Sequence, residues 1–206
     1  MTIDEIPAQV SQYASQAALS MAEAVDAKDR HTFHHSQKVA AYALEAGRSL
    51  GVGEDALGSL YIGALLHDVG KIDILDEILL KPGKLTNLEF EVIKTHPEIG
   101  ARIVEPIDFE ADVVAVVRQH HENYDGSGYP DGLTGDQTSL AARITRVADA
   151  YEAMSTNRLY RKARPSEWIE AEFKRCRGSQ FDPLVVDAFL KGLNSGRIAS
   201  AWKIRD

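Results

Sequence analysis

The chain has seven histidines, all within its first 121 residues, and several of them stand beside carboxylates. They are His31, His34, His35, His67, His96, His120 and His121. Asp68 directly follows one histidine, and Glu122 directly follows a histidine pair. Imidazole and carboxylate together suit Zn, Fe, Mn, Co or Ni, whereas a single cysteine, Cys176, excludes a thiolate zinc cluster. One histidine alone is more often solvated or hydrogen-bonded than metal-bound. Two adjacent histidine pairs and a His–Asp pair, however, predict a metal centre between facing helices.

Helices must position these side chains, because apolar residues recur at helical spacing along most of the chain. The predicted helices cover about the first two dozen residues and residues 32–50, 54–67, 98–105, 111–121, 139–155, 165–176 and 182–193, with one more that starts near residue 87. Thr86 and Glu89 have the spacing of a capping box. Asp182 followed by Pro183 is typical of a helix start, and Pro97 is expected to end the helix before it. No strand pattern or internal repeat is found, so the sequence predicts an all-α helical bundle.

Length and charge narrow the class of protein. A chain of 206 residues can form one domain with a substantial core. We interpret residues 1–28 as an amphipathic helix that links to an upstream region, and residues 29–206 as the domain itself. The net charge of −8 argues against sequence-blind binding of a nucleic acid polymer. The apolar runs are too short to span a membrane, and we expect a cytoplasmic protein.

An ordered set of motifs resembles a known family. The motifs are "DRHTFHHSQKVA" (29–40), "HDVGK" (67–71), "HPEIG" (96–100), "HHENYDGSGYP" (120–130), "ARITRVADAYEAMS" (142–155) and "FDPLVVDAF" (181–189). Together they are similar to the HD-GYP family, the bacterial cyclic-di-GMP phosphodiesterase branch of the HD superfamily. The resemblance covers residues 29–193 and implies a helical bundle of the HD-domain type.

The resemblance also implies a centre of two divalent metal ions, with Fe or Mn expected first and Ni, Co or Zn as alternatives. The implied ligands of one ion are His35, His67, Asp68 and Asp149. The implied ligands of the second ion are His96, His120 and His121, with Asp68 bridging both ions. A carboxylate can bridge because it has two oxygens, whereas a neutral imidazole offers one lone pair. A third ion is left open.

The family pattern assigns further residues to catalysis and substrate binding. Lys71 is expected to face the site and stabilise developing negative charge. Tyr129 is expected to stack on a base or donate its hydroxyl to a phosphate, and Gly128 lets the loop backbone approach the ligand. Arg158 and Arg161 match positions at which the family binds substrate phosphates, although ordinary surface arginines are an equal interpretation.

Four further polar residues lie near the predicted ligands in the sequence. His31 precedes His35 by one helical turn, so it could bind a third ion or stand beside a two-metal centre, which we favour. His34 points about 100° away from His35 and is not expected to be a ligand. Glu122 is expected to support a histidine, with a third ion as the alternative. Asp125 is expected to order its turn.

Three classes of function follow from the resemblance. The first is a phosphodiesterase that hydrolyses cyclic-di-GMP to pGpG and, as a further step, to GMP; a hybrid cyclic GMP–AMP would present the same phosphates. The second is a catalytically weak receptor whose GYP loop contacts a partner such as a GGDEF-domain protein. The third is another HD-superfamily nucleotide hydrolase, which the complete "DGSGYP" loop disfavours. Dimer formation through the N-terminal helix is also left open.

Overall fold

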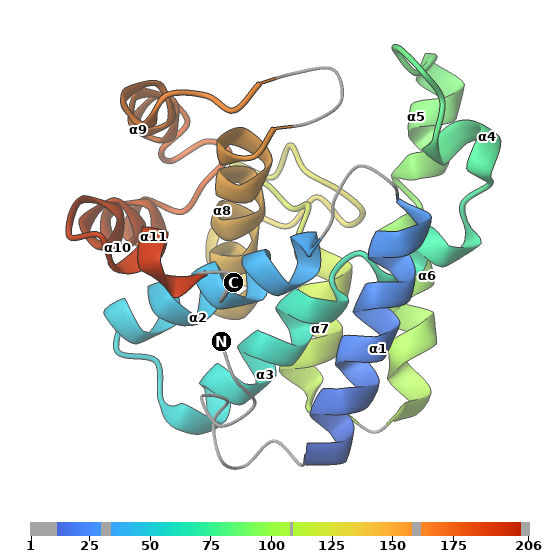
Figure 1. Ribbon diagram of the computed structural model, residues 1–206, viewed down its shortest axis with the longest axis horizontal. Helices are drawn as coiled ribbons and strands as arrows, with labels where there is room; N and C mark the ends of the chain where they lie inside the picture. The colour runs from blue at the N-terminus through green and yellow to red at the C-terminus, as the bar shows by residue number, and fades with distance from the viewer. Residues whose placement is uncertain (1–11, 30–33, 108, 158–161, 203–206) are drawn as a thin grey trace.

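Helices account for nearly all regular structure in the described part of the chain. The computed structural model describes residues 12–29, 34–107, 109–157 and 162–202 (Figure 1). The α-helices are α1 (Gln12–Lys28), α2 (His35–Ser49), α3 (Glu54–Leu66), α4 (Asp76–Leu79), α5 (Asn87–Ile93), α6 (His96–Val104), α7 (Ala111–Gln119), α8 (Leu140–Ser155), α9 (Ser166–Arg175), α10 (Pro183–Asn194) and α11 (Arg197–Ala201). Short 3-10 helices are η2 (Val69–Asp73), η3 (Glu105–Ile107) and η4 (Gly135–Gln137). No strand occurs in these residues, and the predicted all-α bundle is confirmed.

The helix ends follow the predicted local chemistry in most places. The Thr86–Glu89 capping box is formed, and the Asp182 carboxylate accepts the backbone N–H of Leu184. Pro97 differs from the prediction, because it lies inside the first turn of α6 instead of before the helix. A proline fits there since its ring presets a helical φ and the first helical N–H needs no partner. The sequence interpretation missed η2, α4 and α11, which are too short for a periodic pattern to appear.

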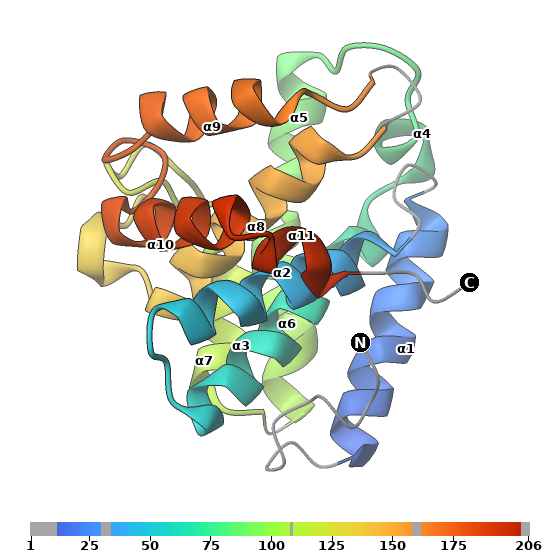
Figure 2. The ribbon, with the colours of Figure 1, turned by 60° about the vertical axis from the view of Figure 1, so that its left-hand side comes forward.

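The core forms where α2, α3, α7 and α8 pack together. α3 packs against α2 on one side and α7 on the other, and α8 packs against α2, α3 and α7. α10 and α11 cover the outer side of α2, as Figure 2 shows. The core side chains include Val39, Leu57, Leu60, Leu65, Val117, Ile144, Val147, Phe173 and Phe189, all buried. In the described residues, no helix has both the length and the apolar character needed to cross a membrane.

Two glycines let η2 lie directly on the start of α6. A Cβ atom on Gly70 would stand 1.9 Å from the carbonyl oxygen of His96 and 2.5 Å from the backbone nitrogen of Gly100. A Cβ on Gly100 would stand 3.2 Å from the backbone nitrogen of Gly70. Backbone atoms cannot yield to such contacts as a flexible side chain can. The approach therefore requires glycine, and it brings Asp68 beside His96.

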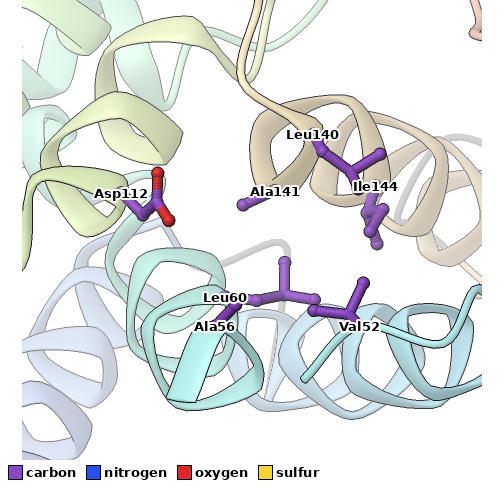
Figure 3. Close-up of a pocket in the computed structure, with 7 residues that line it drawn as sticks. All are labelled: Val52, Ala56, Leu60, Asp112, Leu140, Ala141 and Ile144. Carbon is purple, nitrogen blue, oxygen red and sulfur yellow. The ribbon is translucent and has the colours of Figure 1, made fainter. Parts of the chain in front are cut away.

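A small apolar cavity lies at the N-terminal ends of α3, α7 and α8 (Figure 3). Its volume is about 110 Å³. The lining residues are Val52, Ala56, Leu60, Asp112, Leu140, Ala141 and Ile144. None of the predicted site residues lines it.

Candidate metal centre

The seven predicted metal ligands come together from five separate segments. They are the first residue of α2 (His35), the two residues after α3 (His67 and Asp68), the first residue of α6 (His96), the two residues after α7 (His120 and His121) and one residue inside α8 (Asp149). All except Asp149 stand at helix ends, where adjacent side chains are not held 100° apart as they are within a helix. His120 and His121 therefore both face the cluster, with ring centroids 4.2 Å apart.

The first group of ligand atoms surrounds one oxygen of Asp68. The Oδ2 atom lies 3.6 Å from Nε2 of His35 and 3.4 Å from Nε2 of His67. The two Nε2 atoms are 3.3 Å apart. Asp149 Oδ1 lies 3.5 Å from Nε2 of His35, so a second carboxylate faces the same space.

The second group surrounds the other oxygen of Asp68. The Oδ1 atom lies 3.3 Å from Nε2 of His96 and 3.9 Å from Nε2 of His120. One ligand atom each from Asp68, His96, His120 and His121 all lie within 4.8 Å of one another. Asp68 thus points one oxygen at each group, which is the arrangement that a bridging carboxylate requires.

Three of the imidazoles, those of His67, His96 and His120, turn Nε2 toward the cluster because Nδ1 of each ring bonds a backbone carbonyl. Nδ1 of His67 lies 2.7 Å from the carbonyl oxygen of Ala64, and Nδ1 of His120 lies 2.9 Å from that of Val117. These carbonyls belong to the last turns of α3 and α7, where backbone acceptors lack helical partners. A carbonyl only accepts, so each Nδ1 carries a proton, and Nε2 is the ring nitrogen that is free to bind a metal ion.

The same argument applies to His96, whose Nδ1 lies 2.7 Å from the carbonyl oxygen of Ile93. Its Nε2 lies 3.1 Å from Nε2 of His120. Two lone pairs at this distance repel unless a cation lies between them. Burial and the neighbouring imidazoles of His67 and His96 hold the pKa of His120 well below its ordinary value, which keeps that ring neutral. The donor set therefore fits divalent metal ions.

Glu152 is a buried site residue that the sequence interpretation missed. Its Oε2 lies 2.8 Å from Nδ1 of His35, and it stands one turn after Asp149 on α8. Burial alone would lower the pKa of His35, but the carboxylates of Asp68 and Glu152 outweigh it and raise that pKa to about 10. A proton on His35 thus takes up the negative charge that a metal ion would otherwise balance. The i, i+3 spacing of two carboxylates on one helix was the available signal.

Lys71 faces the cluster, as predicted. Its Nζ donates to Asp68 Oδ2 at 2.7 Å and to Asp29 Oδ2 at 3.1 Å. Burial would raise the pKa of Asp68, but the charge of Lys71 and the imidazoles around the carboxylate hold it well below its ordinary value. Asp29 was not predicted, since it lies 42 residues from Lys71 in the chain.

The GYP loop lies against the second group of ligands. The Tyr129 ring stacks on His121 with centroids 4.8 Å apart and 24° between planes. Burial raises the pKa of the Tyr129 hydroxyl, which stays protonated and can donate. A Cβ on Gly128 would stand 2.2 Å from the backbone nitrogen of Asn123, so glycine is needed for the loop to fold back. This packing role adds to the predicted contact of Gly128 with substrate, which stays a prediction.

Glu122 lies in a different place from the one predicted. Its carboxylate accepts the backbone N–H groups of Asp131 (2.7 Å), Gly132 (3.1 Å) and Leu133 (3.1 Å), instead of supporting a histidine. Both oxygens are engaged by the far side of the loop, so Glu122 holds the loop closed. Asp125 orders its turn as predicted, because its Oδ1 accepts the backbone N–H of Ser127 at 2.9 Å.

The remaining predicted residues are outside the cluster or outside the described residues. His34 has a φ of 57° and its ring lies 5.8 Å from that of Trp202, away from the ligands. His31, Arg158 and Arg161 fall outside the described residues, and their roles stay predictions.

Comparison with known proteins gives consistent matches. A family model described as HD domain matches residues 20–185. The cyclic di-GMP phosphodiesterase response regulator RpfG of Xanthomonas campestris pv. campestris is 40% identical over 174 residues, which cover 84% of this chain and 46% of that protein. A cyclic di-GMP phosphodiesterase of Pseudomonas aeruginosa is 38% identical over 195 residues, covering 93% of this chain and 46% of that protein. The chain thus spans about half the length of these curated relatives.

A solved structure shares the fold. The crystal structure of a cyclic GMP-AMP specific phosphodiesterase of Vibrio cholerae superposes with a TM-score of 0.70 at 18% identity, covering 91% of this chain and 50% of that one. The family match covers most of the chain, and the histidine, aspartate and GYP motifs lie together around one cluster. The chain belongs to the HD domain family, in its HD-GYP branch.

Proposed function

We propose that this chain is a metal-dependent phosphodiesterase that hydrolyses cyclic di-GMP to the linear dinucleotide pGpG, with GMP as a further product. One observation carries the proposal: Asp68 directs its two oxygens at two separate groups of buried imidazoles. The two curated relatives described above are named cyclic di-GMP phosphodiesterases, which supports the choice of substrate.

The chain's own residues would divide the work as follows. Asp68, His35, His67 and Asp149 would hold one ion, and His96, His120 and His121 the other. When bound, two divalent ions supply an activated water and neutralise charge on the attacked phosphate. Lys71, whose ammonium already points at the cluster, would stabilise negative charge that develops on the phosphate.

Substrate contacts would come from the loop and from the segment after α8. The Tyr129 ring stacks on His121 and is partly exposed, so it would contact a base, and its hydroxyl can donate to a phosphate. Arg158 and Arg161 would bind phosphates of the dinucleotide. Gly128 would allow the loop backbone close to the ligand.

Two ions per chain are proposed, with Fe or Mn preferred over Ni, Co or Zn. The described ligand atoms form two groups, and nitrogen with oxygen ligands suits these metals. A third ion at His31 is the alternative count. A cytoplasmic location, a dimer formed through residues 1–28 and contact of the GYP loop with GGDEF-domain proteins complete the proposal.

The test is metal and product analysis of anaerobically purified protein. Protein loaded with Fe²⁺ or Mn²⁺ is expected to hold about two ions per chain and to convert cyclic di-GMP to pGpG. Removal of the metal with a chelator should stop turnover, and re-addition should restore it. Tight binding of cyclic di-GMP without turnover under every metal tested would instead favour the receptor function.

A second substrate, the hybrid cyclic GMP–AMP, is supported by a relative named 3'3'-cGAMP-specific phosphodiesterase 2 of Vibrio cholerae, which is 36% identical over 174 residues. Both cyclic dinucleotides present the same phosphates to the cluster, so they differ only at one base. A comparison of kcat/KM for the two substrates decides between them.

A further inference from the structure

The last turn of α1 contacts two segments that adjoin predicted metal ligands. One is η2, which follows Asp68, and the other is the start of α2, which carries His35. Lys28 Nζ donates to the carbonyl oxygens of Ile72 and Ile74, at 2.7 Å each, and so holds the end of η2. The Asp26 carboxylate accepts the hydroxyl of Ser36 at 2.8 Å and its backbone N–H at 3.2 Å, at the start of α2. The end of α1 therefore braces the backbone that follows Asp68 and the backbone that follows His35.

Asp29, the residue after α1, forms a third contact of this helix end, with the ammonium of Lys71. Its backbone N–H donates to the carbonyl of Val25 at 2.8 Å, which extends the helical hydrogen bonding of α1 to this residue. The Asp29 Oδ2 atom accepts Lys71 Nζ at 3.1 Å, and Asp29 is only 8% exposed. Lys71 is thus shared by one carboxylate directly after α1 and one from the metal cluster.

We infer that Asp29 is a positioning residue, which uses the end of α1 to aim the Lys71 ammonium at the reacting phosphate. The lysine ammonium is attached to a flexible four-carbon chain, so an ion pair with one carboxylate does not fix the direction in which the ammonium points. Two carboxylates on separate segments define it. Asp68 is also the proposed bridging ligand of the metals, so Asp29 supplies a second restraint that does not depend on the cluster. This inference rests on the proposed phosphodiesterase function.

The consequence is that the placement of α1 is coupled to catalysis. Lys28, Asp29 and Asp26 lie within one turn of each other, so a shift of this helix end moves the Lys71 partner and η2 together. Asp29 does not touch the substrate in this scheme and acts through Lys71.

A double-mutant cycle of Asp29→Asn and Lys71→Met tests the inference. Asparagine keeps the shape of the side chain and removes its charge. In the metal-loaded chain, D29N should lower kcat for cyclic di-GMP about tenfold with KM nearly unchanged. In the K71M background the same change should have almost no further effect, because the lysine that it positions is gone. Equal losses in both backgrounds, or no loss in either, would overturn the inference.

A second readout separates this result from failure of the proposed function. Denaturant unfolding of the same four proteins, without substrate, should show that the two changes are non-additive in stability. Additive unfolding free energies would overturn the contact itself. If the wild-type protein does not hydrolyse cyclic di-GMP, the proposed function fails, and the unfolding cycle still decides whether Asp29 holds Lys71. Asp187→Asn removes the charge from an exposed ion pair with Arg177 and is the matched control, with no change expected in kcat.

Discussion

The two ends of the central helices differ in the side chains that fill the space between them. At their N-terminal ends, α3, α7 and α8 surround an apolar cavity lined by Ala56, Asp112 and Leu140, among others (Figure 3). Toward their C-terminal ends, α3 and α7 lead into His67 and His120, and α8 carries Asp149. From Ala56 to His67 is about 16 Å along one helix.

The comparison separates the source of stability from the source of function. At the cavity end, the lining side chains are mostly aliphatic, and Leu60 and Ile144 are buried away from water. Asp112, the one carboxylate among the lining residues, is exposed to solvent. At the cluster end, imidazoles and Asp68 are buried with lone pairs facing one another. Burying such groups costs free energy until a cation satisfies them. If the two ends are independent, a change at one end should leave the properties of the other unchanged.

The largest effect is expected from Asp68→Ala. It removes the carboxylate that faces both groups of imidazoles, so hydrolysis of cyclic di-GMP should fall by about a thousandfold or more. Metal content, measured by mass spectrometry of the dialysed protein, should fall as well. His34→Ala is the control, because its ring points away from the cluster. A D68A protein that kept its metals and its turnover would contradict the bridging role.

Leu60→Ala tests the end of the bundle that holds the apolar cavity. Leu60 is 1% exposed and lines the cavity, so its truncation should enlarge the cavity and cost about 2–5 kcal/mol in the free energy of unfolding. Denaturant unfolding measures the loss. Metal content at low temperature should be unchanged, since no cluster residue is touched. Loss of metal from the folded variant would show that the two ends are coupled.

Lys71→Ala should act on turnover more than on metal occupancy. A cation that stabilises charge in the transition state contributes about 2–3 kcal/mol to the barrier, or roughly a hundredfold in kcat. Parallel measurement of kcat and metal content separates the two effects. Full activity in a fully loaded K71A protein would return Lys71 to an ordinary partner of Asp68.

The smallest effect is expected from His31→Ala. If the centre holds two ions, the variant should keep about two per chain and lose only a few-fold in activity. A neutral histidine brings no charge to balance a third dication, whereas a carboxylate would. A wild-type content near three ions per chain that drops to two in this variant would identify His31 as a ligand.

The bundle itself was predictable from sequence at the level of helices. The Thr86–Glu89 capping box and the Asp182 cap are local features, so their geometry depends on a few neighbouring residues. Helical periodicity located the long helices for the same reason. The short segment η2 was missed, because its conformation depends on glycine contacts with α6 instead of on a repeating pattern.

The predicted ligand set came from the resemblance of the ordered motifs to the HD-GYP family, and those motifs are visible in the sequence alone. Only the tertiary structure decided which partner each side chain meets. Glu152 meets His35 across 117 residues of chain, and Asp29 meets Lys71 across 42. Glu122, adjacent to a histidine in sequence, instead binds the backbone of its own loop. Local rules set the backbone of each helix, but hydrogen-bond partners across helices depend on how those helices pack, which no single segment encodes.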